Sequence, residues 1–380
     1  KDINFYDYDG TCVAAWSLAE LAGKTALPDY PTHEGLTCQG WNWTLADLKA
    51  ENAKMNVGAM YITSDGKTRI YITLQEGRTS PMLGICPNGT VTVDWGDGTT
   101  PDTLTGTSVN TVKWTPTHSY AAPGDYVITL TVNGTAGLRG SGEAYLLRYS
   151  SGSDARNYAY CNAIQRVFFG SGVTGFGNYA FYNCYSLAQI TLPSGVTSIG
   201  ACVFQNCYSL AQITLPSGVT TFNGSTFSGC YSLAQITLPS GVTSINASTF
   251  YYCYSLAQIT LPSGVTSINA NAFQNCYSLA QITLPSGVTG IGNYAFYNCC
   301  SLAQITLPSG VTSIGDSAFV YCYGMAFYDF TACTAVPTLR STNAFSGIPA
   351  DCEIRVPAAL LDEWKAATNW ATYANQIVGV

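Results

Sequence analysis

The chain has 380 residues, of which 47% are hydrophobic and only 10% are charged, and its formal net charge is −7. The apolar fraction excludes a disordered chain, and the low charge, against roughly 25% in ordinary globular proteins, leaves Ser, Thr, Asn, Gln and Tyr to cover the surface. Because no Asp, Glu, Lys, Arg or His occurs between Val167 and Gly315, this stretch has no electrostatic means of holding nucleic acid or an anionic membrane surface.

No apolar run reaches the length of a transmembrane helix, so we expect no membrane insertion. The chain begins at Lys1 without a hydrophobic signal core. We therefore expect that an export signal has been removed.

The first predicted unit is a small β-module over residues 1–57. It contains the strings FYDYDG and HEGLTCQGWNW, and with them it resembles the internalin-type B-repeat of bacterial surface proteins. Cys12 and Cys38 both lie in this module, and a disulfide bridge and two free thiols stay open as alternatives.

The second predicted unit, residues 58–150, alternates polar and apolar residues like the strands of an antiparallel sandwich. Its markers are TVTVDWGDG from Thr90 and HSY at His118, followed by PGDYVITL from Pro123. These motifs resemble a PKD-type, immunoglobulin-like domain, which implies a β-sandwich used as an extracellular spacer. The Gly- and Ser-bearing stretch 134–154 leads onward, and residues 145–147 are a further candidate for strand pairing.

Two Asp-rich segments, at Asp7 and at Asp94, look like fragments of calcium loops. Neither is followed by the spaced carboxylates that such a loop needs. Asp-Gly between apolar runs is a strong hairpin signal, and we favour turns.

The third predicted unit, residues 151–380, is an array of repeats with a period of 23 residues. The string SLAQITLPSGVT occurs six times, and a cysteine recurs at 161, 184, 207, 230, 253, 276, 299 and 322. Each Gln-Ile-Thr-Leu segment predicts a short strand that Pro-Ser-Gly ends. One unit cannot bury its apolar face, so the units must stack into a parallel solenoid of nine strands, roughly 40 Å long. We expect the rest of each unit to return along the convex side as a turn of helix or 3₁₀-helix.

The ends of the array depart from the repeat as caps do. A ninth strand is expected at Glu353 to Pro357, and residues 358–375 have helical spacing with Leu361, Trp364, Ala367 and Trp370 on one face. We interpret this segment as a helix that closes the core.

The pattern LxxIxLPxxVxxIxxxAFxxC resembles the BspA-type leucine-rich repeat of bacterial surface proteins, and the ending from Asn343 resembles the terminal cap of such proteins. Together these cover 161–380. The resemblance implies an exported, extracellular or cell-surface protein, and several members of the family act as adhesins.

The sequence contains little that would support catalysis or metal binding. The only histidines are His33 and His118, and no GxSxG, HExxH, P-loop or Cys-His arrangement is present. The cysteine ladder lacks the clustered ligands of a metal site, so we interpret it as buried packing. We expect no enzyme activity, no cofactor and no metal site.

The remaining candidate is the surface of the solenoid. Ile and Leu of each strand are expected to point inward, so that Gln and Thr point outward toward the concave face, in rows beside a row of Tyr. The predicted ligand-binding residues are Gln189, Thr191, Gln212, Thr214, Gln235, Thr237, Gln258, Thr260, Gln281, Thr283, Gln304, Thr306, Tyr208, Tyr231, Tyr254 and Tyr277. Two interpretations stay open. The rows bond one another and keep the solenoid soluble, or they hold an uncharged extended ligand through many weak contacts.

We therefore expect a secreted or cell-surface bacterial binding or adhesion protein, whose partner is a host or bacterial surface protein or glycan. The alternatives are a structural spacer or assembly protein with no specific ligand, and a phage tail-associated receptor-binding protein.

Overall fold

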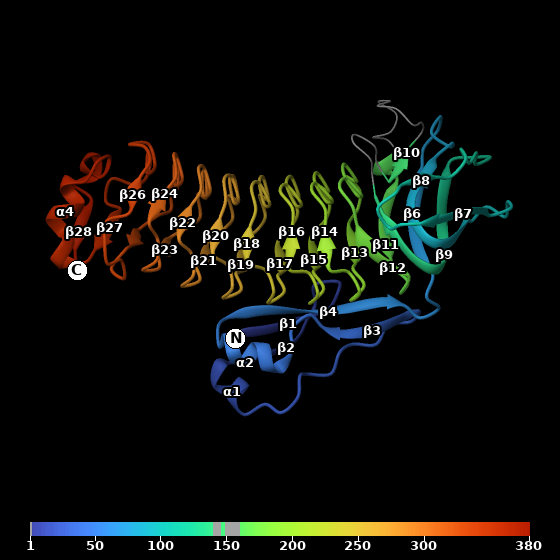
Figure 1. Cartoon of the computed structure of the whole chain (residues 1–380), viewed down its shortest axis with the longest axis horizontal. Helices are drawn as coiled ribbons and strands as arrows, with labels where there is room; N and C mark the ends of the chain where they lie inside the picture. Colours follow the sequence, from blue (N-terminus) through green and yellow to red (C-terminus); the bar gives the residue numbers. More distant parts are fainter. Residues whose placement is uncertain (1, 140–145, 149–159) are drawn as a thin grey trace.

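The structure is a computed structural model that describes residues 2–139, 146–148 and 160–380. Figure 1 shows a long stack of short strands with antiparallel strands at one end and a small N-terminal module beside the stack. No helix in the described part of the chain is long and apolar enough to cross a membrane.

The N-terminal module is a four-stranded sheet with two short helices. Its elements are β1 (Ile3–Tyr6), β2 (Cys12–Trp16), α1 (Leu18–Ala22), β3 (Leu36–Trp41), α2 (Leu45–Glu51) and β4 (Met55–Thr63), and the strand order is β2-β1-β4-β3. Both helices begin at a capping box, Ser17 with Glu20 and Thr44 with Asp47. The module has its own hydrophobic core, separate from that of the rest of the chain.

The second region is built from antiparallel strands. They are β5 (Thr68–Leu74), β6 (Met82–Asp94), β7 (Asp102–Thr107), β8 (Lys113–Trp114), β9 (Gly124–Leu138) and β10 (Leu147–Arg148). β9 pairs with both β5 and β6, and β10 pairs with β6. Of the residues 145–147 that we expected to pair, Leu147 does so, whereas residue 145 and most of the stretch 140–159 lie outside the described residues.

This second region closes the open end of the solenoid. β5 pairs antiparallel with the first solenoid strand, β11 (Ile164–Phe168), and β9 pairs in parallel with β12 (Val173–Phe176). Buried residues from Ile70 to Ile377 consequently form one continuous hydrophobic cluster. The region acts as an N-terminal cap in the sense that repeat arrays require.

The solenoid carries two rows of parallel strands. The first row continues from β11 with β13 (Gln189–Thr191), β15 (Gln212–Thr214), β17 (Gln235–Thr237), β19 (Gln258–Thr260), β21 (Gln281–Thr283), β23 (Gln304–Thr306), β25 (Phe327–Asp329), β27 (Glu353–Val356) and β28 (Ile377–Gly379). The second row continues from β12 with β14 (Ser198–Ile199), β16 (Thr221–Phe222), β18 (Ser244–Ile245), β20 (Ser267–Ile268), β22 (Gly290–Ile291), β24 (Ser313–Ile314) and β26 (Thr338–Leu339). Equivalent residues pair in register, for example Gln212 with Gln235 and Ile213 with Ile236.

The interior consists of ladders of identical side chains. Phe227, Phe250 and Phe273 are fully buried, and the rings of neighbouring repeats stack 5.6 and 5.4 Å apart. The ladder cysteines are buried as well. From Cys207 to Cys322 each ladder thiol donates to the carbonyl oxygen of a Phe in the preceding repeat, as Cys253 Sγ does to Phe227 O at 3.2 Å. An apolar side chain would fill the same space but could not donate this hydrogen bond, which explains why cysteine occupies the position.

One expectation about helices is wrong, and a second holds only in part. The return segments are turns rather than helix or 3₁₀-helix, because two residues per repeat adopt left-handed backbone, such as Cys202 (φ 57°) and Asn206 (φ 61°). The C-terminal segment is not one helix. η1 (Ala358–Leu360) leads directly into α4 (Leu361–Ala366), whereas η2 (Trp370–Tyr373) is separate because Ala367 is extended and Asn369 is left-handed. Trp364 and Trp370 are nevertheless fully buried, so the segment closes the core as expected.

Candidate binding surface

The Gln and Thr rows form one face of the first row of strands, which we call the QIT face. It consists of the Gln and Thr side chains of β13, β15, β17, β19, β21 and β23. The Ile between each Gln and Thr is buried, from Ile305 at 1% exposed to Ile282 at 7%, as the alternation predicted.

The Tyr row lies along one side of this face. Tyr185, Tyr208, Tyr231, Tyr254 and Tyr277 stack face to face, with neighbouring ring centroids 4.4, 4.4, 4.7 and 5.0 Å apart. Cys300 interrupts the row, so Tyr323 instead stacks on Tyr321 at 5.6 Å. Tyr277 is 40% exposed and ends the continuous stack.

The N-terminal module lies against the QIT face (Figure 1), an arrangement that sequence reasoning missed. Strand β4 crosses four repeats and contacts β13, β15, β17 and β19. The approach is close enough that a Cβ atom added at Gly58 would clash with the Thr214 side chain, and one added at Gly10 would clash with Gln212. Glycine at these positions therefore permits the docking.

Asn42 and Trp43 are the centre of this contact. Asn42 is fully buried, and its Nδ2 donates to Leu215 O at 3.2 Å and to Thr237 Oγ1 at 3.1 Å. Its Oδ1 accepts from the Gly58 N–H at 2.8 Å. Trp43 Nε1 donates to Leu238 O at 2.8 Å. A buried amide with its hydrogen bonds satisfied on both sides holds the two surfaces in one register.

Three further pairs of residues extend the contact to both sides through hydrogen bonds. The Ser194 N–H donates to Gln39 Oε1 at 2.7 Å, and Gln212 Nε2 donates to Tyr8 O at 2.9 Å. At the far side Glu51 accepts from the N–H and the hydroxyl of Ser263, at 3.2 and 2.6 Å. The module keeps its own core, and these hydrogen bonds join it to the repeats.

The docked module divides the predicted site residues. Thr191 and Thr237 are buried, at 5% and 4% exposed, and Gln189, Gln212, Thr214 and Gln235 are half-buried. The expectation of one continuous open strip is therefore wrong for the first repeats, because β4 and Asn42 cover them. Gln258, Gln281, Thr283, Gln304 and Thr306 are exposed and Thr260 is half-buried. Whether any of these residues binds a ligand stays a prediction.

We call the uncovered part, from Gln281 to Thr306, the open window. It borders a groove of about 700 Å³ whose lining includes Gln281, Thr283, Ser286, Gln304 and Thr306. The open window is bounded by charged residues on both sides. Lys54 of the module, its side chain 80% exposed, lines a second hollow with Gln258 and Gln281.

The other boundary of the open window is formed by β25 and β27, whose sequences differ from the repeated Gln-Ile-Thr. Phe327 follows Gln304 in register, and Glu353 follows Phe327. Arg355 lies over the Phe327 ring, 3.8 Å from its centroid, and its Nε donates to Glu353 at 2.8 Å. The neutral strip thus ends at an ion pair.

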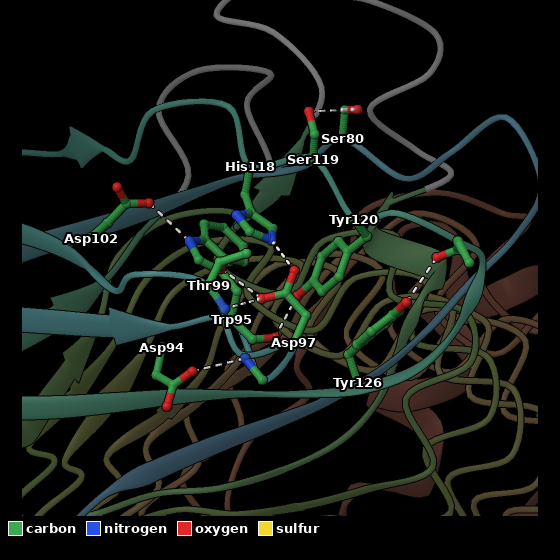
Figure 2. Close-up of polar contacts among 12 residues, drawn as sticks. Ser80, Asp94, Trp95, Asp97, Thr99, Asp102, His118, Ser119, Tyr120 and Tyr126 are labelled. Atoms are coloured by element: carbon green, nitrogen blue, oxygen red, sulfur yellow. Dashed lines mark hydrogen bonds and ion pairs between the residues drawn. The ribbon is translucent and has the colours of Figure 1, made fainter.

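The two Asp-rich segments are turns held by hydrogen bonds. The segment after Asp94 connects β6 and β7, and Figure 2 shows His118 stacked on Trp95 and bonded to Asp97, with Nε2 and Oδ2 2.8 Å apart. Burial raises the pKa of Asp97, but hydrogen bonds from Thr99 and His118 outweigh it and hold that pKa below its usual range. In the first module Asp7 accepts from the Tyr8 N–H and lies 2.8 Å from His33.

The residues around Asp97 are also joined to one another by hydrogen bonds within the second region. Tyr120 donates its hydroxyl to Trp95 O, and Trp95 Nε1 donates to Asp102. Within the described ranges, no group of three or more His, Cys, Asp or Glu residues is placed to hold a metal ion.

The cysteines are unbridged throughout the described residues, and Cys12 and Cys38 are both free thiols. Burial raises the pKa of the ladder thiol Cys253 well above its usual range. A protonated, inaccessible thiol is a poor nucleophile, so the ladder is suited to packing rather than chemistry.

Comparison with known proteins places the repeats in a family. The model of the BspA-type leucine-rich repeat region matches residues 154–279 and 243–349, just over half of the chain. No curated protein matches the chain.

Several solved structures resemble the chain. The leucine-rich repeat protein of T. pallidum, TpLRR, is 32% identical, with 50% of this chain and 83% of that chain covered and a TM-score of 0.40. A leucine-rich cell surface protein of Faecalibacterium prausnitzii is 24% identical, with 61% and 87% covered and a TM-score of 0.32. The pneumococcal vaccine antigen PcpA is 17% identical, with 55% and 64% covered and a TM-score of 0.35.

Proposed function

The chain belongs to the BspA-type leucine-rich repeat family, and on that premise we propose that it is a non-enzymatic bacterial binding protein that works outside the cell or at its surface. Members of a repeat family of this kind typically bind through an extended regular surface. The proposal includes adhesion to a host or bacterial surface protein or glycan, as the sequence resemblance implied.

The binding site that we propose is the open window together with Gln258 and Thr260. The observation that carries this choice is the exposure of the QIT face in its last repeats, beside a groove of about 700 Å³. The side chains there are neutral amides and hydroxyls, which recognise a partner by hydrogen bonds rather than by long-range attraction. Tyr277, half-exposed at the end of the stacked row, supplies an aromatic face nearby.

A binding screen of the whole chain against surface proteins and glycans tests the proposal. Gln281→Ala combined with Gln304→Ala should lower the affinity for a captured partner by about tenfold without changing the melting temperature, because both side chains are exposed. The matched control is Gln189→Ala with Gln235→Ala, the same change in repeats next to the module. Equal losses in the two pairs would contradict the choice of the open window.

A structural role is the second candidate, and one observation favours it. The module uses the QIT face of four repeats for an intramolecular contact, so part of this surface serves assembly within the chain. A spacer or assembly protein would give no saturable binding in the screen. The phage tail-associated alternative predicts binding to bacterial surface glycans specifically.

A further inference from the structure

The docked module touches the same place in successive repeats, namely the Leu-Pro-Ser turn that follows each strand. Ser194 offers its N–H to Gln39, and Ser263 offers its N–H and hydroxyl to Glu51. The two repeats between them offer carbonyl oxygens instead, Leu215 to Asn42 and Leu238 to Trp43. Four identical turns therefore act as four contact points for protein side chains.

The most specific of these contacts is that of a carboxylate. Both Glu51 oxygens lie 3.2 Å from the Ser263 nitrogen, and one lies 2.6 Å from the Ser263 hydroxyl. A backbone N–H and an adjacent hydroxyl that converge on one carboxylate form charge-assisted hydrogen bonds, which are stronger than neutral ones. The repeats themselves contribute no cation to this contact, because none occurs between Val167 and Gly315.

The next two repeats contain the same turn without the module. Ser286 and Ser309 follow the strings QITLP that precede Ser263 as well, and both are exposed. Within the described residues, no group accepts a hydrogen bond from the N–H of either serine. Ser286 lines the groove of the open window together with Leu284 and Pro308.

We propose that the turns at Ser286 and Ser309 bind carboxylate side chains of a partner polypeptide, in the way that Ser263 binds Glu51. The inference rests on the proposed function and specifies its partner as an acidic protein segment. A polypeptide is favoured over a glycan because a protein segment occupies the preceding turns, and the open window continues that interface. Lys54 borders the open window with a side chain that is 80% exposed, and its Nζ lies 3.8 Å from Asp2 Oδ1.

The test uses the full chain labelled with ¹⁵N-serine and two small probes. N-acetyl-glutamate N-methylamide carries the carboxylate, and N-acetyl-glutamine N-methylamide is its neutral match. Ser286→Ala and Ser309→Ala each remove one amide signal and thereby assign it. We expect the amide signals of Ser286 and Ser309 to shift saturably with the glutamate probe, with a dissociation constant at least about fivefold lower than for the glutamine probe.

Ser263 is the internal control, because its turn is identical but holds Glu51. Its amide signal should not respond in the native chain and should respond like that of Ser286 in Glu51→Ala. The proposal is overturned if the two probes act equally, if neither Ser286 nor Ser309 responds, or if Ser263 stays silent in Glu51→Ala. Stronger shifts with methyl glucuronide than with the glutamate probe would overturn the polypeptide in favour of an acidic glycan.

The two proposals fail in different ways. If the surface screen detects a partner whose binding depends on Gln281 and Gln304 while the serine amide signals do not respond, the binding function stands and this inference fails. If the amide signals respond as described but the screen is silent, the turns bind carboxylates and the wider function is wrong.

Discussion

Repeats of identical sequence lie in two different environments along this solenoid, one covered by the N-terminal module and one exposed. The repeat around Thr237 and the repeat around Thr306 share the string SLAQITLPSGVT, yet Thr237 is 4% exposed and Thr306 is exposed. The strand, its inward Ile and the following turn are the same in both. The difference lies in the N-terminal module, which covers one repeat and leaves the other open. A repeat's sequence thus determines its fold, while the segment packed on it determines what it is free to bind.

The largest expected effect comes from the interior, where covered and open repeats do not differ. Phe250 is fully buried between Phe227 and Phe273, so Phe250→Ala should lower the free energy of unfolding by about 3–5 kcal/mol. Chemical denaturation measures it, with Tyr277→Ala, at a half-exposed site, as the control. A loss below about 1 kcal/mol would mean that this ladder is not the core.

The next largest effect, that of Asn42→Ala, should differ between the covered repeats and the open ones. Asn42→Ala removes the hydrogen bonds to Leu215 O and Thr237 Oγ1 and leaves the Gly58 N–H unpaired, which should cost about 1–3 kcal/mol of stability. Hydrogen exchange of β15 and β17 should accelerate, whereas exchange of β21 and β23 should not change. Equal acceleration in all four strands would contradict a local docking contact.

An effect of similar size, but confined to one contact, is expected at Gly58, which lies against Thr214. Gly58→Ala should cost about 1–3 kcal/mol through overpacking, because its new Cβ would meet the Thr214 side chain. Adding Thr214→Ala should restore most of the loss, and the double-mutant cycle measures the coupling. Gly195→Ala is the matched control, since nothing lies within 4 Å of a Cβ there.

Much of the solenoid could be predicted from the sequence, because the 23-residue repeat and the alternation of polar and apolar residues indicate which side chains point inward. Ile190, Phe250 and the ladder cysteines are buried as their spacing indicated. The return segments could not be predicted as turns, since left-handed backbone at residues such as Cys202 is not apparent from composition. The break at Asn369 likewise interrupts a helical pattern that apolar spacing alone supports.

The candidate site was predictable only in part. The rows of Gln and Thr follow from the strand pattern, but their coverage depends on a module nearly two hundred residues away in sequence. Asn42 and Glu51 carry no motif that marks them as contact residues, and identical repeats give no hint that some are occupied. The pairing of β5 and β9 with the first repeat is equally non-local.

The central claim, that the module covers the QIT face of the first repeats and leaves the last ones open, is tested most directly by labelling rates. Thr237→Cys and Thr306→Cys place the same thiol in the same local sequence, and site-resolved mass spectrometry follows its reaction with a maleimide separately from that of the natural cysteines. We predict that the thiol at position 306 reacts at least about tenfold faster than the thiol at 237, because reaction requires access to the thiolate. Asn42→Ala should bring the two rates closer. Equal rates in the otherwise native chain would contradict the account.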